Sequence, residues 1–260
     1  MKQYVVDAFA DRVFGGNPTA VCVLDKPISD DLMQKIAIEN NLPETAFAVR
    51  EGEWYRLRWF TPGGEINLCG HATLAAGYAL FRFFHPDWPR IVFHTMSGDL
   101  YVRRDGDLIL MDFPAFHCHK VPVTPQMGEA LGATPAEAYL DRDLLLVYEN
   151  AETVKGLVPD FEKTKALDGY CVGVTAPGDG YDCVSRFFAP KLKVPEDPAT
   201  GSIHCMIAPY WADRLGKNEI LAYQASPRGG VMRCRILPED RVEVCGYAAL
   251  FSVADLFLPE

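Results

Sequence analysis

The feature that most constrains the fold of this chain is an internal duplication. Each half contains an arginine followed by aromatic residues and a proline, then a polar loop, a glycine and a long apolar stretch. The distance between the copies is far too long for a solenoid repeat. The chain is therefore expected to form two similar lobes. In order, the copies comprise Arg58–Pro62, Gly70 and residues 72–84 in the first half, and Arg186–Pro190, Gly201 and residues 203–215 in the second.

The pattern around these segments predicts the class of fold. Tyr55–Trp59 alternates between apolar and charged residues, as expected of a sheet with one face on a core. The two apolar stretches predict helices that are hydrophobic nearly all round and are therefore enclosed by sheet. Hairpins are predicted over Leu100–Phe113, turning at Asp105-Gly106, and over Val231–Tyr247. We predict an α+β fold in which each lobe is a curled mixed or antiparallel sheet around a central helix.

The length of 260 residues exceeds one average domain and fits two lobes. We place the N-terminal lobe at residues 1–115 and the C-terminal lobe at residues 116–247. Residues 248–260 are predicted to pack back on the N-terminal lobe.

Composition argues against several classes of partner. The net charge is −10, and the sequence contains no run of basic residues that could bind a phosphate backbone. Nucleic acid is therefore not an expected partner. No uninterrupted apolar run of membrane-spanning length occurs, and Asp7 interrupts the N-terminus where a signal peptide needs apolar residues. The eight cysteines form no C-x-x-C pair, so most are expected to be reduced and buried. We expect a cytoplasmic enzyme.

Glu44 is a lone carboxylate directly before an apolar segment. Residues 29–40 predict an amphipathic helix with Ser29 as its N-cap and with Pro43 beyond its end. Glu44 then precedes the apolar segment Thr45–Val49, where a lone carboxylate is unusual unless it faces water or a cavity. From these residues alone, a solvated residue after a proline turn is the preferred interpretation.

Several short motifs occur together along almost the whole chain. At these residues the sequence resembles the phenazine-biosynthesis-like (PhzF-type) isomerase family, which is related to diaminopimelate epimerase. The motifs are Asp7-Ala8-Phe9, Gly16-Asn17-Pro18, Pro43-Glu44-Thr45, Cys69-Gly70-His71-Ala72-Thr73, Asp197-Pro198-Ala199-Thr200-Gly201-Ser202 and Arg228-Gly229-Gly230.

The resemblance implies a diaminopimelate-epimerase-like fold, a homodimer and an active site between the lobes. It also implies that neither a metal nor an organic cofactor is needed. Glu44 takes the role of the acid and base that moves a proton, and His71, Asp197 and Ser202 are its partners in catalysis.

These residue types suit isomerisation by proton transfer. One carboxylate can take a proton from carbon and return it elsewhere, so Glu44 can act first as base and then as acid. Exclusion of water is expected to raise the pKa of Glu44 towards neutrality. His71 and Asp197 are expected to polarise the substrate or hold its functional groups.

Gly70 and Gly201 are predicted to bind the substrate, together with Cys69 and Thr200 that precede them. A glycine at the start of a helix lets a ligand approach the backbone N–H groups of the first turn. The partial positive charge there favours a carboxylate and the negative charge that develops on deprotonation. We therefore expect a small anionic substrate.

Two alternative functions stay open. A racemase with two thiols needs a cysteine before each glycine, and Cys69 satisfies this, but Thr200 occupies the second position. A protein that binds a small molecule without catalysis could keep the same fold. Retention of Glu44, His71, Asp197 and Ser202 together argues against the second alternative.

Other motifs have simpler explanations. Ser202 and His204 are two residues apart on a predicted helix and point to different faces, which argues against a hydrolase triad. His117 and His119 could share a strand face as metal ligands, but surface histidines are the preferred interpretation. Residues 178–180 are interpreted as a turn rather than a dinucleotide site. Residues 228–230 fit an anion site and a bend before the hairpin about equally well.

Overall fold

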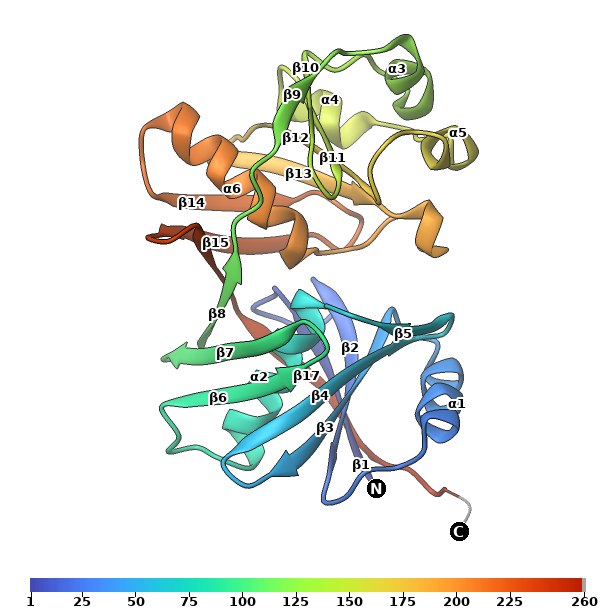
Figure 1. The fold of residues 1–260 in the computed structure, drawn as a ribbon, viewed down its shortest axis with the longest axis vertical. Coiled ribbons are helices and arrows are strands. Elements are labelled where there is room, and N and C mark those ends of the chain that lie inside the picture. Colours follow the sequence, from blue (N-terminus) through green and yellow to red (C-terminus); the bar gives the residue numbers. More distant parts are fainter. Residues whose placement is uncertain (259–260) are drawn as a thin grey trace. The chain divides into compact units, whose positions relative to one another are not determined.

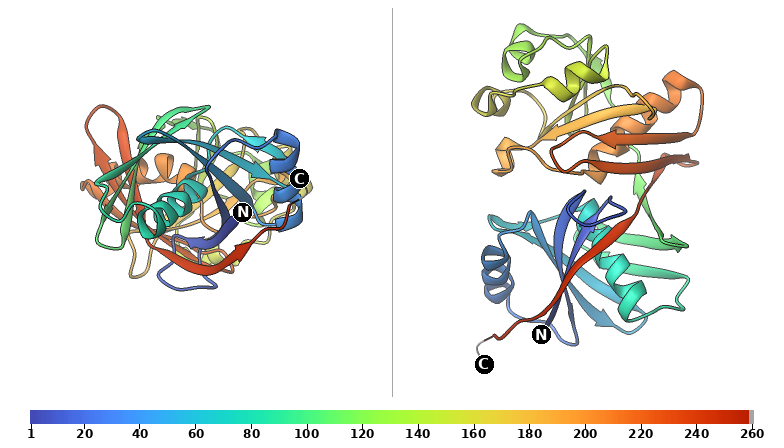
Figure 2. Two further views of the ribbon diagram at one scale, coloured as in Figure 1. Left: turned by 90° about the horizontal axis from the view of Figure 1, so that it is seen from below. Right: turned by 180° about the vertical axis from the view of Figure 1, so that it is seen from behind.

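A computed structural model describes residues 1–258 and divides the chain into two units. Unit 1 comprises Met1–Asp112 and the C-terminal segment from Cys245, and unit 2 is Phe113–Val244. The predicted boundaries lie at 115/116 and 247/248. Figures 1 and 2 show the elements of each unit.

Unit 1 is a mixed sheet. Pairing gives the strand order β17-β1-β2-β3-β4-β6-β7-β8, in which β2–β3 and β4–β6 are parallel and the other pairs antiparallel; β5 pairs with β4. The C-terminal strand lies along β1, as the right-hand view of Figure 2 shows. The strands are β1 (Lys2–Ala8), β2 (Asn17–Leu24), β3 (Glu44–Glu51), β4 (Trp54–Thr61), β5 (Gly64–Ile66), β6 (Arg90–Thr95), β7 (Gly98–Asp105), β8 (Leu108–Pro114) and β17 (Ala248–Asp255).

Two helices complete unit 1. Helix α2 (Gly70–Phe83) contacts β1, β2, β3, β7 and β17, and nearly all its side chains are buried. Helix α1 (Asp30–Asn40) packs against β3 and β4 through Met33, Ile36 and Ala37. Its predicted N-cap is confirmed, since Ser29 Oγ accepts a hydrogen bond from the Leu32 N–H at 3.3 Å. The sheet of unit 1 therefore surrounds one central apolar helix, as predicted.

Unit 2 repeats this plan. Pairing gives the order β9-β10-β11-β12-β13-β14-β15, with β11–β12 and β13–β14 parallel and the others antiparallel. Helix α6 (Gly201–Leu215) packs against β14 and β15. The other elements are β9 (His119–Val121), α3 (Pro125–Leu131), β10 (Glu137–Leu140), β11 (Leu144–Val147), α4 (Ala151–Gly156), α5 (Phe161–Lys165), β12 (Val172–Pro177), β13 (Cys183–Phe188), the 3₁₀ helix η1 (Pro190–Leu192), β14 (Glu219–Gln224), β15 (Gly230–Leu237) and β16 (Arg241–Gly246).

The order of pairings confirms the duplication. Strand pairing follows the same sequence in both units: parallel, antiparallel, parallel and antiparallel. In unit 1 this sequence runs from β2 to β7, and in unit 2 it runs from β11 to β15. In both, the apolar helix connects the strands of the second parallel pair. The predicted α+β fold of two similar lobes is confirmed. Both helices begin earlier than residues 72 and 203, because the glycines themselves form the first helical position.

The remaining expectations concern hairpins, cysteines and surface. Strands β7 and β8 form the predicted hairpin, with Gly106 at φ +57° in its turn. Strands β15 and β16 are joined by a turn in which Glu239 and Asp240 lie in the left-handed region.

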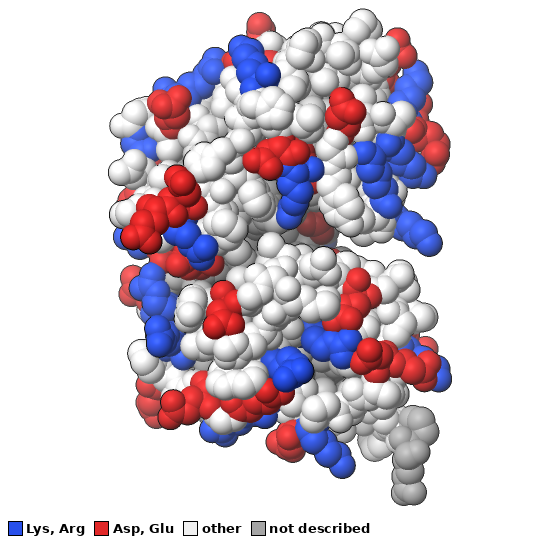
Figure 3. Space-filling view, viewed as in Figure 1, with Lys and Arg blue, Asp and Glu red and all other residues white. Residues whose placement is uncertain are grey.

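All eight cysteines are free, and seven are buried. No helix within residues 1–258 is long and apolar enough to cross a membrane. On the face shown in Figure 3, acidic and basic side chains are interspersed.

Candidate active site

Unit 1 buries a carboxylate, an imidazole and a thiol together. Glu44 is the first residue of β3, and Cys69 and His71 flank the first residue of α2. The three residues are only 8%, 5% and 3% exposed, respectively. Glu44 Oε2 lies 2.6 Å from His71 Nε2, and Cys69 Sγ lies 3.5 Å from His71 Nδ1 and 3.8 Å from Nε2. The local fold explains this meeting, because α2 packs against β3.

Charge and burial set the protonation states of this group. Burial, followed by the nearby Glu44 carboxylate, raises the pKa of the Cys69 thiol to about 11, so Cys69 is a neutral thiol near pH 7. Burial opposes the charged form of His71, but its contacts with Cys69 and Glu44 together raise the pKa of His71 well above its usual value, and with Cys69 as a thiol the neighbouring charge is that of Glu44. The structure thus favours an imidazolium beside the Glu44 carboxylate.

A buried oxygen beside Glu44 lacks a hydrogen-bond partner within residues 1–258. It is Thr19 Oγ1, whereas Glu44 Oε2 contacts His71. Thr19 on β2 is the register partner of Glu44 on the parallel strand β3, so both side chains project from the same face. Buried polar atoms without partners are rare in native structures and call for an explanation such as a ligand.

Unit 2 holds the second group of predicted residues in a hydrogen-bonded loop before α6. The Thr200 hydroxyl donates to Asp197 Oδ2. The buried Gln224 of β14 accepts from the Thr200 N–H at 2.8 Å and donates to the Asp197 carbonyl at 2.7 Å and to Thr200 Oγ1 at 3.2 Å. Ser226 Oγ donates to the Pro198 carbonyl at 2.7 Å. The loop between Asp197 and α6 is therefore fixed to the end of β14.

The starts of α2 and α6 differ from those of α1, α4 and α5. Ser29, Asn150 and Asp160 each cap a helix through a side-chain oxygen, whereas the N-cap residues of α2 and α6, Cys69 and Thr200, make no side-chain capping bond. Ser202, in the first turn of α6, is half-buried, and its hydroxyl bonds to no residue in the described part of the chain. Neither N-cap side chain therefore occupies the first-turn N–H groups of its helix through a capping bond.

Comparison with known proteins identifies the family. The model of the family described as phenazine biosynthesis-like protein matches residues 6–254. The chain belongs to this family. An uncharacterized isomerase of Pseudomonas aeruginosa is 48% identical over 253 residues, covering 97% of each chain. A crystal structure from the PhzF family of Enterococcus faecalis is 48% identical, with a TM-score of 0.97 and 99% of each chain covered.

A more distant likeness concerns the fold alone. The structure of a hydroxyproline epimerase from Agrobacterium vitis has a TM-score of 0.61 at 11% identity and covers 98% of this chain and 91% of its own. The names of the family relatives support an isomerase role in general for this member of the phenazine biosynthesis-like family.

The structure groups the predicted site residues of this family member by unit. Glu44, Cys69, Gly70 and His71 come together in unit 1. Asp197, Thr200, Gly201 and Ser202 come together at the start of α6 in unit 2. The expected site between the lobes stays a prediction. The interpretation of Glu44 as a solvated residue after a turn is wrong, since Glu44 is buried.

The sequence analysis missed Gln224 and Ser226. Both act on the Asp197 loop across more than 20 residues of sequence, and Gln224, at the end of β14, belongs to no sequence motif. Gln224 is fully buried, which is unusual for a glutamine, but only the structure shows this burial.

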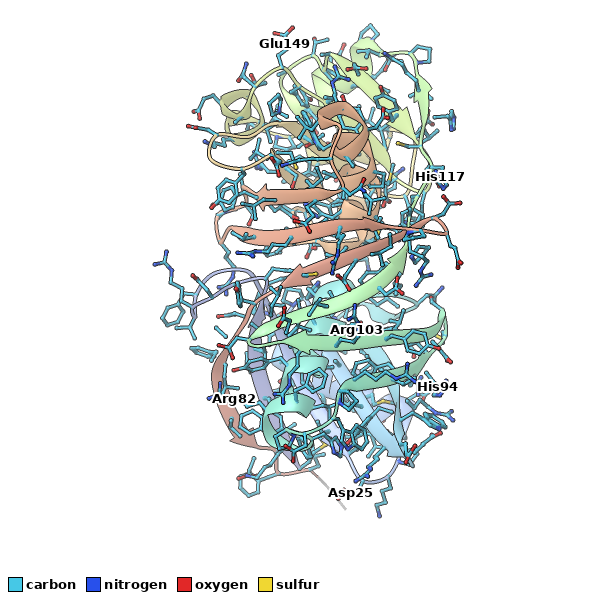
Figure 4. All side chains as sticks on the ribbon, turned by 90° about the vertical axis from the view of Figure 1, so that its left-hand side faces the viewer. Asp25, Arg82, His94, Arg103, His117 and Glu149 are labelled. Carbon is cyan, nitrogen blue, oxygen red and sulfur yellow. The ribbon has the colours of Figure 1, made fainter. Side chains whose placement is uncertain are left out.

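Residues outside the site have structural explanations. His204 contacts the Thr200 carbonyl at 2.7 Å and Ser185 Oγ at 3.4 Å, and burial lowers its pKa to about 4. His117 points outward, as labelled in Figure 4, and its Nε2 lies 3.3 Å from Asp240. Gly229, at φ +67°, packs against Tyr223 in a turn before β15, which accounts for the glycine there.

Proposed function

We propose that this protein is a cofactor-independent isomerase or epimerase that transfers a proton on a small, carboxylate-bearing metabolite, with Glu44 as the proton shuttle. The observation that carries the proposal is the burial of Glu44 beside His71, with 2.6 Å between Oε2 and Nε2. A buried carboxylate next to an imidazolium has a proton within reach and little competing water.

The proposed reaction uses each group of unit 1 for one task. Glu44 takes a proton from a carbon next to the substrate carboxylate and returns a proton at the new position. His71, as the charged neighbour, can donate to negative charge that develops on the substrate. The uncapped start of α2 offers backbone N–H groups to the substrate anion.

In unit 2, Asp197 and Ser202 are proposed to complete the reacting set. The hydroxyl of Ser202 is not engaged by the described residues and can donate to the substrate, while Asp197 is held by Thr200. The start of α6, which has no side-chain cap, is a second place for an anion. This arrangement supports an anionic substrate for a chain of net charge −10.

The direct test replaces Glu44 by glutamine. Glu44→Gln keeps the size of the side chain but cannot accept a proton, so we expect turnover to fall by about 10²- to 10⁴-fold, the usual contribution of a general acid or base. The assay screens small carboxylic acids for protein-dependent exchange with solvent deuterium, read by NMR. Glu39→Gln, on the exposed face of α1, is the matched control and should keep wild-type exchange. Unchanged exchange in Glu44→Gln removes Glu44 from this role.

The same assay separates the proposal from non-catalytic binding. A binding protein without chemistry shifts the resonances of its ligand but leaves every carbon-bound hydrogen in place. Incorporation of deuterium into a bound ligand favours an isomerase. The homodimer stays a prediction that light scattering can test.

A further inference from the structure

Three side chains in unit 1 form a set of donors typical of a transition-metal site. Glu44, Cys69 and His71 each offer one ligand atom, and the three atoms lie within 4.8 Å of one another. They represent carboxylate oxygen, thiolate sulfur and imidazole nitrogen, the three types of protein ligand that bind Zn²⁺.

The separations suit a small cation. Metal–ligand bonds of about 2.0–2.3 Å place neighbouring ligand atoms of a tetrahedral site roughly 3.3–3.6 Å apart. Cys69 Sγ and the nitrogens of His71 already lie 3.5 and 3.8 Å apart. Glu44 Oε2 and His71 Nε2, at 2.6 Å, have to separate by less than about 1 Å, which a small rotation of the glutamate achieves.

Charge balance also allows a divalent cation at this place once Cys69 and His71 give up their protons. The three residues are buried, and a buried charge is costly unless it is compensated. A carboxylate and a thiolate together neutralise one divalent cation. Within residues 1–258 the contact of Glu44 Oε2 is with His71 Nε2, at 2.6 Å, and a cation that binds both atoms replaces the proton between them.

We propose that a thiophilic divalent cation, with Zn²⁺ as the best match, binds Glu44, Cys69 and His71 and inhibits the enzyme. Binding exchanges the thiol proton of Cys69, and the proton on Nε2 of His71 where present, for the cation, and these protons pass to solvent. The inhibition rests on the proposed function, because the cation occupies the carboxylate that moves the proton. The binding itself does not rest on it.

The ligand set also predicts which cations do not bind. Mg²⁺ and Ca²⁺ are hard cations that prefer oxygen ligands, and this group supplies only one carboxylate. Sulfur and nitrogen donors select zinc, cadmium and similar metals.

The first test measures binding directly on the full chain after treatment with a chelator. Titration with Cd²⁺ is followed by the ultraviolet charge-transfer absorption of the cadmium–thiolate bond, and titration with Zn²⁺ by calorimetry. We expect one cation per chain and no binding of Mg²⁺. Loss of a direct ligand in Cys69→Ser or His71→Asn should weaken binding by more than roughly 100-fold, because loss of even an outer partner of a metal ligand costs 10- to 100-fold.

The chain supplies a matched control for this test. In His117-Cys118-His119 a cysteine stands between two histidines, and Cys118 is the least buried of the eight cysteines. Cys118→Ser should leave the cadmium–thiolate band intact. A band that disappears in Cys118→Ser and persists in Cys69→Ser overturns the proposal, as does the absence of any band in the wild type.

A misfolded variant cannot imitate the expected result if stability is measured in parallel. Cation binding to the folded wild type raises its thermal midpoint by mass action, and this rise should survive in Cys118→Ser. The two proposals also fail separately. If the wild type binds zinc but Glu44→Gln keeps normal turnover, only the proposed function is refuted. If Glu44→Gln is inactive but the wild type binds no cation, only the metal site is refuted.

Discussion

At the scale of single residues, the pair formed by Glu44 and His71 links proton binding to stability. The pKa of His71 is raised in the folded protein above its unfolded value of about 6.5. Proton binding by His71 therefore stabilises the fold fully below about pH 6.5, and this contribution is lost as the pH rises through the folded pKa of His71.

Glu44→Gln removes the charge that helps to raise this pKa, and the effect on stability should depend on pH. The variant is expected to lose most stability relative to the wild type near about pH 6, and less as the pH rises. Breaking a buried pair costs about 3–5 kcal/mol when the remaining charge stays, and His71 can shed its proton, so we expect a smaller loss. Urea unfolding at several pH values measures it. Burial lowers the pKa of His204, and its contribution to stability is common to the wild type and the variant. It therefore cancels in the difference between their free energies of unfolding.

Cys69 decides between the carboxylate and thiol mechanisms. A thiol whose pKa is raised to about 11 supplies little thiolate near pH 7, and Thr200 occupies the position of the second thiol. We expect Cys69→Ser to lower the rate of deuterium exchange far less than Glu44→Gln does. Loss of exchange in Cys69→Ser together with normal exchange in Glu44→Gln supports the thiol racemase instead.

At the scale of elements, the strand registers show how a duplicated plan carries different chemistry in its two copies. Phe60 pairs with Thr45 in unit 1, and Phe188 pairs with Val172 in unit 2. Because Phe60 and Phe188 match in the duplication, Cys171 takes the place of Glu44. Burial raises the pKa of the Cys171 thiol to about 12, so unit 2 offers no charged acid or base there.

Gln224 is expected to position Asp197. Gln224→Met keeps the volume but leaves the Thr200 N–H and the Asp197 carbonyl without partners, which costs about 1–3 kcal/mol of stability for each buried group left unpaired. Displacement of the loop should lower kcat more than it raises KM, because Asp197 acts on the reacting atoms in the proposed mechanism. Gln126→Met, on an exposed turn of α3, is the control. A change in stability with unaltered kcat confines Gln224 to a structural role.

The sequence predicted the elements better than the contacts between them. Periodicity identified the helix capped by Ser29 and the apolar helix after Gly70, because these patterns depend on near neighbours. The contact between Glu44 and His71 was implied only by the family resemblance. The contacts of Gln224 and Ser226 with the Asp197 loop were not predicted, since they depend on the register of β14, which is set by packing.

At the scale of the whole molecule, the proposed function requires that residues of both units act in one reaction. Glu44 belongs to unit 1, and Asp197 belongs to unit 2. Residues that act together in one step show strongly non-additive effects, whereas independent sites show additive ones. A double-mutant cycle therefore tests whether the duplicated halves form one catalytic unit.

We expect Glu44→Gln and Asp197→Asn each to reduce deuterium exchange strongly, and the double variant to be little slower than the slower single variant. The reason is that a reaction already deprived of its base gains nothing from the partner that assists the same step. The exposed pair Glu39→Gln and Asp213→Asn, one in each unit, controls for the substitutions themselves. Free-energy effects of Glu44→Gln and Asp197→Asn that simply add assign the two residues to separate tasks, and the single reaction proposed for the two units is then wrong.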